Sequence, residues 1–507
     1  MKPGPRLLSW VVAVAMLPAC TKPGPEGRTI VIVQAEGPLS LEPCENNEDF
    51  SANVLGNVFE PLIAMSADLR LVPALAASWY TPDATTWVFR LREGARWHDG
   101  SAVKPAEVVA SLERARRDPK SRRRPELSQI TTIATGGEGE VVLTTRAPFG
   151  ALASQIAQVP VSRPPGPGAR FPLGTGPYLI EGFTPGGDTL LVPAGDGSRF
   201  RSLLFRVIPD AGERLRMLAD GRADIIPYLA AGEAAALERS ATAKVLRRRG
   251  LLIAFLAMDY ARAQSPYVTS KGNPFRDIRV RRALAGVIDR GALLKEALGG
   301  EGDTLTQLVV PEAFGFSPGL PQGGPDPAAA RKRMAEAGFE AGFGVALDFE
   351  GVGVEDSMER VVQVLARQFA QIGVRVKPRP HTTQQLLSRV ESHDTSFYLL
   401  SWVGTSGDLG STAEFLLRTP SEGRGTDNGG NYSSPEADAL IDEASATLDP
   451  AARLAILRRL EERVRADLPV IPLLRREDRY GAAKRISFEL RLDREIRGVT
   501  MVVDGKR

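Results

Sequence analysis

Residues 396–415 contain an abrupt change from apolar to small polar side chains (Ser-Phe-Tyr-Leu-Leu-Ser-Trp-Val-Gly-Thr-Ser-Gly-Asp-Leu-Gly-Ser-Thr-Ala-Glu-Phe). The apolar run 397–400 has the length of a buried strand. Ligands of open α/β sheets bind where loops leave the carboxyl ends of strands, and glycine lets the backbone approach a ligand closely. The residues expected to line a substrate-binding site are therefore Trp402, Gly404, Thr405 and Asp408. The alternative is that Trp402 belongs to the core and that Asp408 only caps a turn.

The first twenty residues have the pattern of an export signal. Lys2 and Arg6 precede the apolar run 7–17, which is too short to span a bilayer, and Cys20 follows a small residue. This pattern resembles the lipobox of bacterial lipoproteins. The resemblance implies a signal peptide at 1–19, lipidation of the Cys20 thiol, and a Pro- and Gly-rich tether at 20–27. The alternative is an ordinary secretory signal with an incidental cysteine.

The length of the chain requires more than one core. With 507 residues, of which 43% are hydrophobic and 25% charged, the composition is ordinary for a soluble protein of two or three domains. The formal net charge of +3 does not indicate a nucleic-acid partner, and the basic run 114–124 has no interleaved aromatic residues. If Cys20 is acylated, Cys44 is the one cysteine left, and no intramolecular disulfide can form.

Strand and helix patterns alternate along the chain. A β-branched run at 29–33 and an alternating segment at 87–92 predict strands, as do the runs 374–377 and 470–474. Helices are predicted from Pro105, from Asp326-Pro327 and from Asp449-Pro450, and apolar residues recur at helical spacing over 358–372. This alternation predicts an α/β fold with largely parallel sheets covered by helices on both faces.

Four segments of the N-terminal third follow one another at spacings that match a known family. They read Asn-Val-Phe-Glu-Pro-Leu at 57–62, Leu-Val-Pro-Ala-Leu-Ala-Ala-Ser-Trp at 71–79, Phe-Arg-Leu-Arg-Glu-Gly-Ala-Arg-Trp-His-Asp-Gly at 89–100 and Ala-Glu-Val-Val-Ala-Ser-Leu at 106–112. Together with the segments 174–178, 278–290 and 431–438, they closely resemble the family 5 extracellular solute-binding proteins, the peptide/nickel-type receptors of ABC importers.

The resemblance implies a periplasmic-binding-protein fold of type II, with two lobes around a cleft. Lobe one is expected at 28–256 with an extra subdomain at 57–160, lobe two at 258–469, and a C-terminal return to lobe one at 470–507. The chain is expected to cross between the lobes near 257–260 and 467–472. The implied protein is a monomer without a cofactor. It captures a small-molecule or peptide ligand in the periplasm or on the outer face of the membrane, and delivers it to an ABC permease.

The sequence shows no recognisable catalytic or metal-binding motif. Its three histidines, His98, His381 and His393, lie in separate segments, and there is no Gly-x-Ser-x-Gly, His-Glu-x-x-His, Cys-x-x-Cys or phosphate-binding loop. His98 lies in the Trp-His-Asp-Gly turn of the family, which explains it structurally. A solute receptor is therefore favoured over an enzyme. A lipoprotein hydrolase and a sensor or holdase that does not transport are the alternatives.

The expected ligand differs from that of the dipeptide receptors of the family. Those receptors carry an Asp three residues after the loop Trp, and here that position is Thr405. They also carry an Arg before the helix that corresponds to 358–372, whereas the segment 350–356 has no Arg. Because an unpaired buried ammonium or carboxylate costs several kcal/mol, we expect a solute that lacks one or both free peptide termini. Candidates are an oligosaccharide, a modified or longer peptide, or another polar metabolite.

Overall fold

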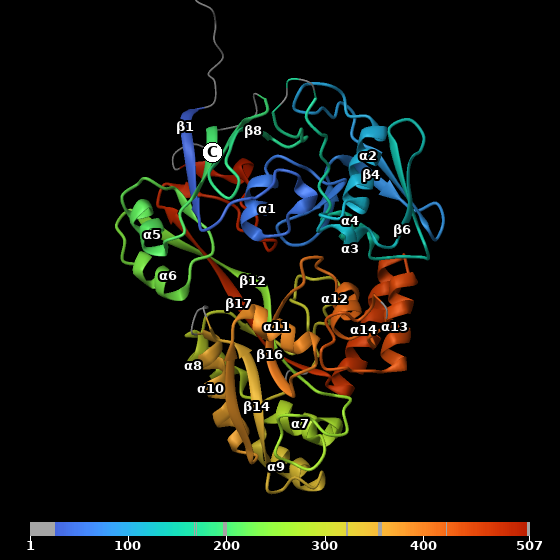
Figure 1. Ribbon diagram of the computed structural model, residues 1–507, viewed down its shortest axis with the longest axis vertical. Helices are drawn as coiled ribbons and strands as arrows, with labels where there is room; N and C mark the ends of the chain where they lie inside the picture. Colours follow the sequence, from blue (N-terminus) through green and yellow to red (C-terminus); the bar gives the residue numbers. More distant parts are fainter. Residues whose placement is uncertain are drawn as a thin grey trace, which may run out of the picture.

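The computed structural model describes residues 26–166, 168, 170–195, 200–320, 323–352, 357–421 and 423–503. The expected signal peptide and the lipidation residue Cys20 lie outside these residues. The first strand, β1 (Glu26–Gln34), already includes the end of the expected tether, because its pairing with β10 (Phe200–Val207) begins at Glu26. Two bodies, one above the other in the view of Figure 1, are joined by long strands at its centre.

The upper body, which we call lobe one, is built on one half of a large mixed sheet. β1 pairs in parallel with β10 and with β11, and β8 and β9 extend the sheet antiparallel beyond β10. The remaining strands of this half are β8 (Tyr178–Phe183), β9 (Thr189–Pro193) and β11 (Ile225–Ile226). The helices of lobe one are α1 (Asp49–Leu55), α5 (Ala211–Ala219) and α6 (Ala231–Leu237). Ile30, Ile32, Leu203 and Phe205 lie at the centre of its hydrophobic core.

A second core belongs to a separate four-stranded antiparallel sheet with the order β4-β5-β7-β6. We call this part the extra subdomain. Its strands are β2 (Ile63–Met65), β3 (Leu71–Pro73), β4 (Ala76–Tyr80), β5 (Thr86–Leu91), β6 (Ile130–Thr135) and β7 (Glu140–Thr145), and its helices are α2 (Pro105–Arg117), α3 (Arg124–Leu127) and α4 (Leu152–Ile156). Trp87, Phe89 and Leu91 point into this core as the alternation predicts, but Val88 is buried as well.

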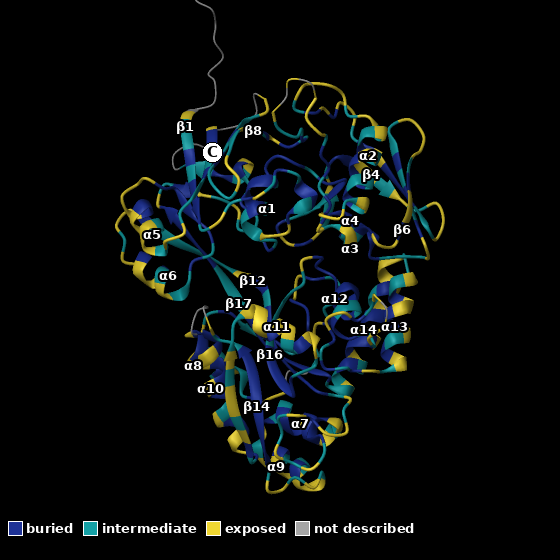
Figure 2. Ribbon diagram, viewed as in Figure 1, coloured by how far each residue is buried: buried dark blue, intermediate teal, exposed yellow. Residues whose placement is uncertain are grey.

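The lower body, lobe two, has cores on both faces of the other half of the large sheet. β14 (Phe343–Glu350) pairs in parallel with β15 (Val374–His381) and with β16 (Phe397–Val403). The helices are α7 (Ile278–Val287), α8 (Arg290–Leu298), α9 (Pro327–Glu336), α10 (Ser357–Ala370), α11 (Thr383–Glu391), α12 (Leu409–Leu416), α13 (Pro435–Ala446) and α14 (Pro450–Asp467). Figure 2 shows β14 buried, whereas the edge strand β15 and the outer faces of the helices are partly exposed.

Two strands connect the lobes. β12 (Ala243–Met258) and β17 (Val470–Ala483) pair antiparallel, from Ala243 opposite Ala483 to Ala257 opposite Val470. Their outer ends belong to the core of lobe one, and 251–258 and 470–474 belong to the cores of lobe two. The limits of the lobes stay a prediction. The point at which each strand passes from the core of lobe one to the cores of lobe two, however, lies inside the strand, near 247–250 in β12 and 475–479 in β17. The crossings were expected at the strand ends.

The sequence patterns predicted the α/β class and most elements, but not the pairing. Asp326 and Asp449 cap α9 and α14 as predicted, each accepting a backbone N–H with its side chain. The expectation of largely parallel sheets was wrong, because β12 pairs antiparallel with both β16 and β17, and β8 to β10 are antiparallel as well. After β17, the chain returns to lobe one through β18 (Ile486–Ser487) and β19 (Val502–Val503).

Candidate ligand-binding cleft

A cavity of about 340 Å³ lies where lobe one, the extra subdomain and lobe two meet. We call it the cleft cavity. Lobe one contributes α1 with the turn before it and the C-terminal residues Asp493, Glu495 and Arg497. The extra subdomain and the segments that lead into and out of it contribute Met65, Arg123, Glu126 and Gln158, and lobe two contributes Thr405. The volume is in the range of small-molecule sites.

The motif segments of the sequence hold the C-terminal residues of this wall in place. The Asn57 side chain donates to the carbonyl of Ile496 at 2.8 Å and accepts the backbone N–H of Gly498 at 2.7 Å. Gly174 packs directly on Val58, the residue after Asn57. A Cβ on Gly174 would lie 2.0 Å from the Val58 carbonyl oxygen, which explains why glycine stands there. Residues 57–58, 174–176 and 496–498 thus form one rigid support below the cleft cavity.

The cleft cavity is rich in carboxylates, most of which have a basic partner. Arg494 pairs with Asp49, Arg491 with Asp493 and Arg497 with Glu495, and Arg123 lies 3.5 Å from Glu126. Among the described residues, the Glu48 carboxylate has no such partner and accepts a single hydrogen bond, from the backbone N–H of Asn47 at 3.2 Å. Glu48 is therefore the carboxylate of this wall that is free to bind a donor group.

Behind this wall, the Asp478 side chain is largely buried, with 13% of it exposed. Burial raises the pKa of its carboxyl, while Arg494 works in the opposite direction from 3.3 Å. A Cβ on Gly250 of the paired strand would lie 2.5 Å from this carboxylate. The connecting strands therefore carry charged groups directly behind the candidate site.

Thr405 and Asp408, three residues apart in the loop after β16, have different surroundings. Thr405 is exposed, lines the cleft cavity and donates from its hydroxyl to the Gln158 side chain at 3.1 Å. Asp408 is 5% exposed, caps α12 by accepting the backbone N–H of Gly410, and forms a bidentate ion pair with Arg453 at 2.5 and 2.9 Å. In this structure, Asp408 therefore anchors the loop, and its carboxylate is fully engaged.

Trp402 and Gly404 border the cleft cavity without lining it. The Trp402 ring packs on Phe415 with its centroid 6.2 Å away and lies against a core of lobe two. Its indole N–H is buried and has no hydrogen-bond partner. Gly404 lies between this indole and the Thr412 hydroxyl, which is also buried without a partner. The two unsatisfied groups mark a polar spot directly beside the loop.

The histidines and the cysteine have structural surroundings. His98 accepts the backbone N–H of Gly174 and donates to the Gly176 carbonyl, and burial lowers its pKa. His381 lies 2.7 Å from Asp348. Burial raises the pKa of the Cys44 thiol to about 12. In the part of the chain that the structure describes, no group of three or more His, Cys, Asp or Glu residues could hold a metal ion.

The sequence patterns missed two residues of the cleft cavity. Glu48 precedes a short helix in a loop with several other acids, and Gln158 follows α4 in a segment without a motif. The only available signal was their position relative to the segment 57–160, in which the family motifs are concentrated: Glu48 lies shortly before this segment and Gln158 near its end. No helix in the described ranges combines the length and the apolar character needed to cross a membrane.

Comparisons with known proteins agree with this architecture. Glutathione-binding protein GsiB of Pectobacterium atrosepticum is 26% identical over 485 residues and covers 91% of each chain, and GsiB of Escherichia coli K12 is 24% identical over 493 residues, covering 92% of each.

Among solved structures, HbpA2 of Haemophilus parasuis matches with a TM-score of 0.81 at 20% identity, covering 94% of this chain and all of the other. A nickel ABC transporter protein of Bacillus halodurans matches with 0.78 at 20% identity, covering 94% and 100%. These matches confirm the two-lobed, type II periplasmic-binding-protein fold. A family model described as "Bacterial extracellular solute-binding proteins, family 5 Middle" matches residues 70–423. Because this match spans most of the sequence, the chain belongs to the family 5 bacterial extracellular solute-binding proteins.

Proposed function

We propose that this protein is the lipid-anchored, monomeric receptor of an ABC importer, and that it closes its two lobes on a peptide-like or other polar solute. The observation that carries the proposal is the cleft cavity, whose wall is supplied by segments from both lobes and from the extra subdomain. Family membership supports the role in solute capture, and the relatives are named as binding proteins and not as enzymes.

The connecting strands provide the hinge for this closure. Where the core changes, β12 and β17 carry charged residues in place of core side chains: Arg247 and Arg249 lie on one strand and Glu477 on the other, with 3.4 Å between Arg247 Nε and the Glu477 carboxylate. Ion pairs, which include those of the buried Arg475 and Arg479, stand here in place of the apolar core of either lobe, and we place the hinge at this point. Small-angle scattering with a bound solute should give a smaller radius of gyration than without it. An unchanged radius would contradict closure.

Closure would bring the loop after β16 onto the solute. We propose that Thr405 and Gly404 contact it directly, that Trp402 supplies an apolar wall beside them, and that Asp408 holds the loop through Arg453. Glu48 on the opposite wall would bind an amino or other donor group. A charge-assisted hydrogen bond of this kind contributes about 1.5–3 kcal/mol.

The solute is proposed to lack at least one free peptide terminus. The guanidiniums that line the cleft cavity, Arg123 and Arg497, both have carboxylate partners, so neither is free for a terminal carboxylate. Relatives and neighbours are named for glutathione, for a murein tripeptide and for the peptide STSA, which places modified and longer peptides among the candidates. Native mass spectrometry of protein purified without denaturation would test this. A bound unmodified dipeptide would contradict the proposal, and a capped peptide or sugar would support it.

The lipid anchor is proposed from the sequence around Cys20. Acyl chains contribute about 0.8 kcal/mol per buried methylene, so several chains anchor a protein stably. The variant Cys20→Ser, expressed in a bacterial host and fractionated, should move from the membrane to the soluble extracytoplasmic fraction. Cys44→Ser is the matched control and should stay with the membrane. If Cys20→Ser also stays there, the anchor does not depend on this thiol.

A further inference from the structure

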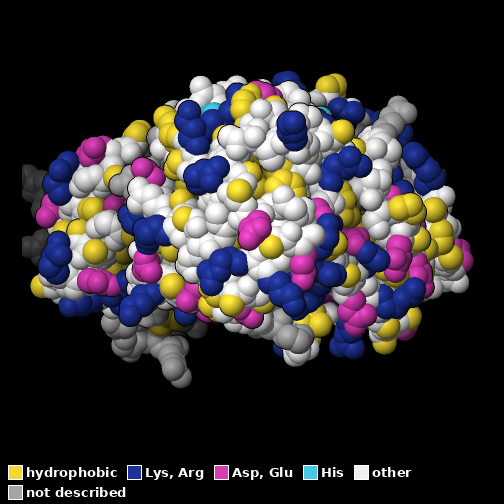
Figure 3. Space-filling view, turned by 90° about the horizontal axis from the view of Figure 1, so that it is seen from below, with side chains coloured by type: hydrophobic (Ala, Val, Ile, Leu, Met, Phe, Trp, Pro, Cys, Tyr) yellow, Lys and Arg dark blue, Asp and Glu magenta, His cyan; other side chains and the backbone are white. Residues whose placement is uncertain are grey.

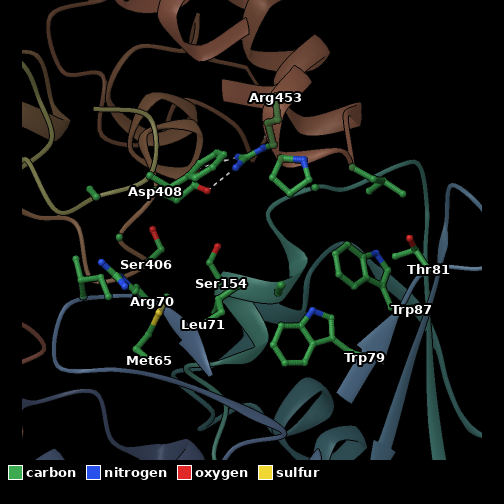
Figure 4. A pocket seen from close by; sticks show the side chains of 18 of the residues that line it. Met65, Arg70, Leu71, Trp79, Thr81, Trp87, Ser154, Ser406, Asp408 and Arg453 are labelled. Carbon is green, nitrogen blue, oxygen red and sulfur yellow. Dashed lines mark hydrogen bonds and ion pairs between the residues drawn. The ribbon is translucent and has the colours of Figure 1, made fainter. Parts of the chain in front are cut away.

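A second and larger cavity lies on the other side of the loop after β16. Its volume is about 550 Å³, and it lies between the extra subdomain and three parts of lobe two: residues 312–314, the loop after β16, and the start of α14 with the turn before it. We call it the aromatic cavity. Figure 4 shows Trp79 and Trp87 on one side, Met65 and Arg70 on the other, and the Asp408–Arg453 ion pair across from the indoles. Leu71, Phe314 and Leu448 complete an apolar lining.

Among the described residues, the exposed Arg70 guanidinium is the one charged group of this lining without a partner, and the Trp87 indole N–H is buried without one. The other charged groups of the lining are paired within the protein. Asp408 and Arg453 satisfy each other, and Glu312 lies 2.9 Å from Arg475. The Ser154 hydroxyl donates to the Ala151 carbonyl at 2.9 Å. Two indole rings and a phenyl ring then remain as the main contact surface, and such surfaces favour aromatic and bulky aliphatic groups.

The aromatic cavity is held open by direct contacts between the two parts that enclose it. The backbone N–H of Gly150 donates to the Ser445 carbonyl at 2.6 Å, so closely that a Cβ on Gly150 would lie 2.2 Å from the Thr447 oxygen. On the opposite side, Leu69 of the β2–β3 turn enters a core of lobe two against Gly407. In this conformation of the two lobes, these contacts set the separation of the walls.

The aromatic cavity adjoins the cleft cavity. Met65 lines both of them, and the loop after β16 divides them, with Thr405 facing the cleft cavity and Ser406 and Gly407 facing the aromatic cavity. Met65 is thus the shared wall at which a rotamer change of this flexible side chain would connect the two cavities.

From this shared wall we infer that the two cavities form one binding site of two compartments. The polar part of the solute lies in the cleft cavity, and an aromatic or bulky aliphatic group of the same solute lies between Trp79 and Trp87. The inference rests on the proposed function and adds the chemical class of the solute: a polar, peptide-like molecule with one large apolar substituent.

The first experiment tests the aromatic cavity with a small aromatic probe that has no peptide-like part to bind in the cleft cavity. 4-Fluorobenzyl alcohol at millimolar concentration is followed by ¹⁹F NMR. We expect line broadening with the wild type and its loss with Thr81→Trp, which fills the mouth of the aromatic cavity. The reciprocal variant Thr405→Trp fills the cleft cavity and should keep the broadening. Trp79→Ala removes a half-buried wall and should reduce the broadening even if Thr81→Trp folds poorly. No broadening with the wild type, or equal broadening in all variants, would overturn the inference.

The second experiment tests whether one solute occupies both compartments. Thermal shifts are compared for glutathione and S-benzylglutathione, and for alanyl-glycyl-alanine amide and alanyl-phenylalanyl-alanine amide. The aromatic member of at least one pair should raise the melting temperature more than its partner, and Thr81→Trp should abolish the difference. No gain in either pair would overturn the link between the cavities. Failure of the proposed function would instead appear as an unchanged radius of gyration with every solute, whatever the fluorinated probe does.

Discussion

The two cavities beside the loop after β16 differ in chemistry although one five-residue loop separates them. The cleft cavity is polar, with five carboxylates and two guanidiniums in its lining. The aromatic cavity has two indoles and a phenyl ring, and its charged groups other than Arg70 are paired within the protein. The cleft cavity is suited to recognising a charged or hydrogen-bonding group, and the aromatic cavity to accepting an apolar one. The difference indicates that specificity is divided between the two sides of one loop. On the face seen in Figure 3, Lys and Arg side chains are spread over the whole surface, with Asp and Glu side chains among them.

The largest effect is expected at Asp408, which forms part of the division between the cavities. Asp408→Ala leaves the buried Arg453 guanidinium without its partner, which costs about 3–5 kcal/mol of unfolding free energy. Guanidinium chloride unfolding followed by circular dichroism measures this loss. The control is Asp442→Ala, which removes a half-exposed partner of Arg418 and Arg424 and should cost about 1 kcal/mol or less. Equal losses would mean that the Asp408 ion pair does not organise the loop.

The free energy of unfolding should depend on pH through a buried carboxyl of lobe two that lines neither cavity. Glu461 lies on α14, which also carries Arg453, and burial raises the pKa of its carboxyl to about 8, while Arg465 works in the opposite direction. From the ordinary value of 4.5 up to about 8, the folded state binds a proton that the unfolded state has released.

The free energy of unfolding should therefore fall as pH rises through this window, by up to about 1.4 kcal/mol per unit from this group. Urea unfolding across the window measures the slope. Glu461→Gln should reduce it, and the exposed neighbour variant Glu462→Gln should leave it unchanged. An unaltered slope in Glu461→Gln would show that this carboxyl is ionised in the folded protein.

In the cleft cavity, Glu48→Gln should weaken binding of a solute with a free amino group by about 10- to 100-fold, because a charge-assisted hydrogen bond becomes a neutral one. Calorimetry with an amidated peptide measures the change, and the same peptide with an acetylated amino group should bind both proteins equally. Glu36→Gln is the control, since Glu36 is exposed and does not line the cleft cavity. A comparable loss of affinity in Glu36→Gln would mean that the summed negative charge of the acidic loop, and not Glu48 itself, binds the amino group.

The smallest effect is expected at Thr405, on the same side of the loop. Thr405→Ala removes one hydroxyl and its hydrogen bond to Gln158, so affinity should fall by a few-fold, about 1 kcal/mol or less. Thr405→Ser keeps the hydroxyl and should bind as the wild type does. If Thr405→Ala binds the apolar probe of the aromatic cavity more weakly as well, the two compartments are less independent than their linings indicate.

The candidate site could be predicted only in part. The change from apolar run to glycine loop located the segment that separates the two cavities, and the register of that loop placed Thr405 where the dipeptide receptors of the family have an acid. The sequence could not show that Thr405, and not Asp408, lines the cleft cavity. That distinction depends on Arg453, which lies 45 positions further along the chain and is brought to the loop by the packing of α14. Glu48 could not be singled out among its acidic neighbours, because which carboxylates find a basic partner depends on C-terminal residues more than 400 positions away.

The sequence by itself determined local structure: the period of each strand and helix, the Asp-Pro starts of α9 and α14, and the motif segments that identify the family. These features depend on neighbouring residues, so their physical causes lie within a short window. The tertiary structure alone decided the antiparallel pairing of β12 with β17, the position of the change of core within these strands, and the existence of the aromatic cavity. Each of these arises from contacts between residues tens to hundreds of positions apart, and short-range patterns carry no information about such contacts.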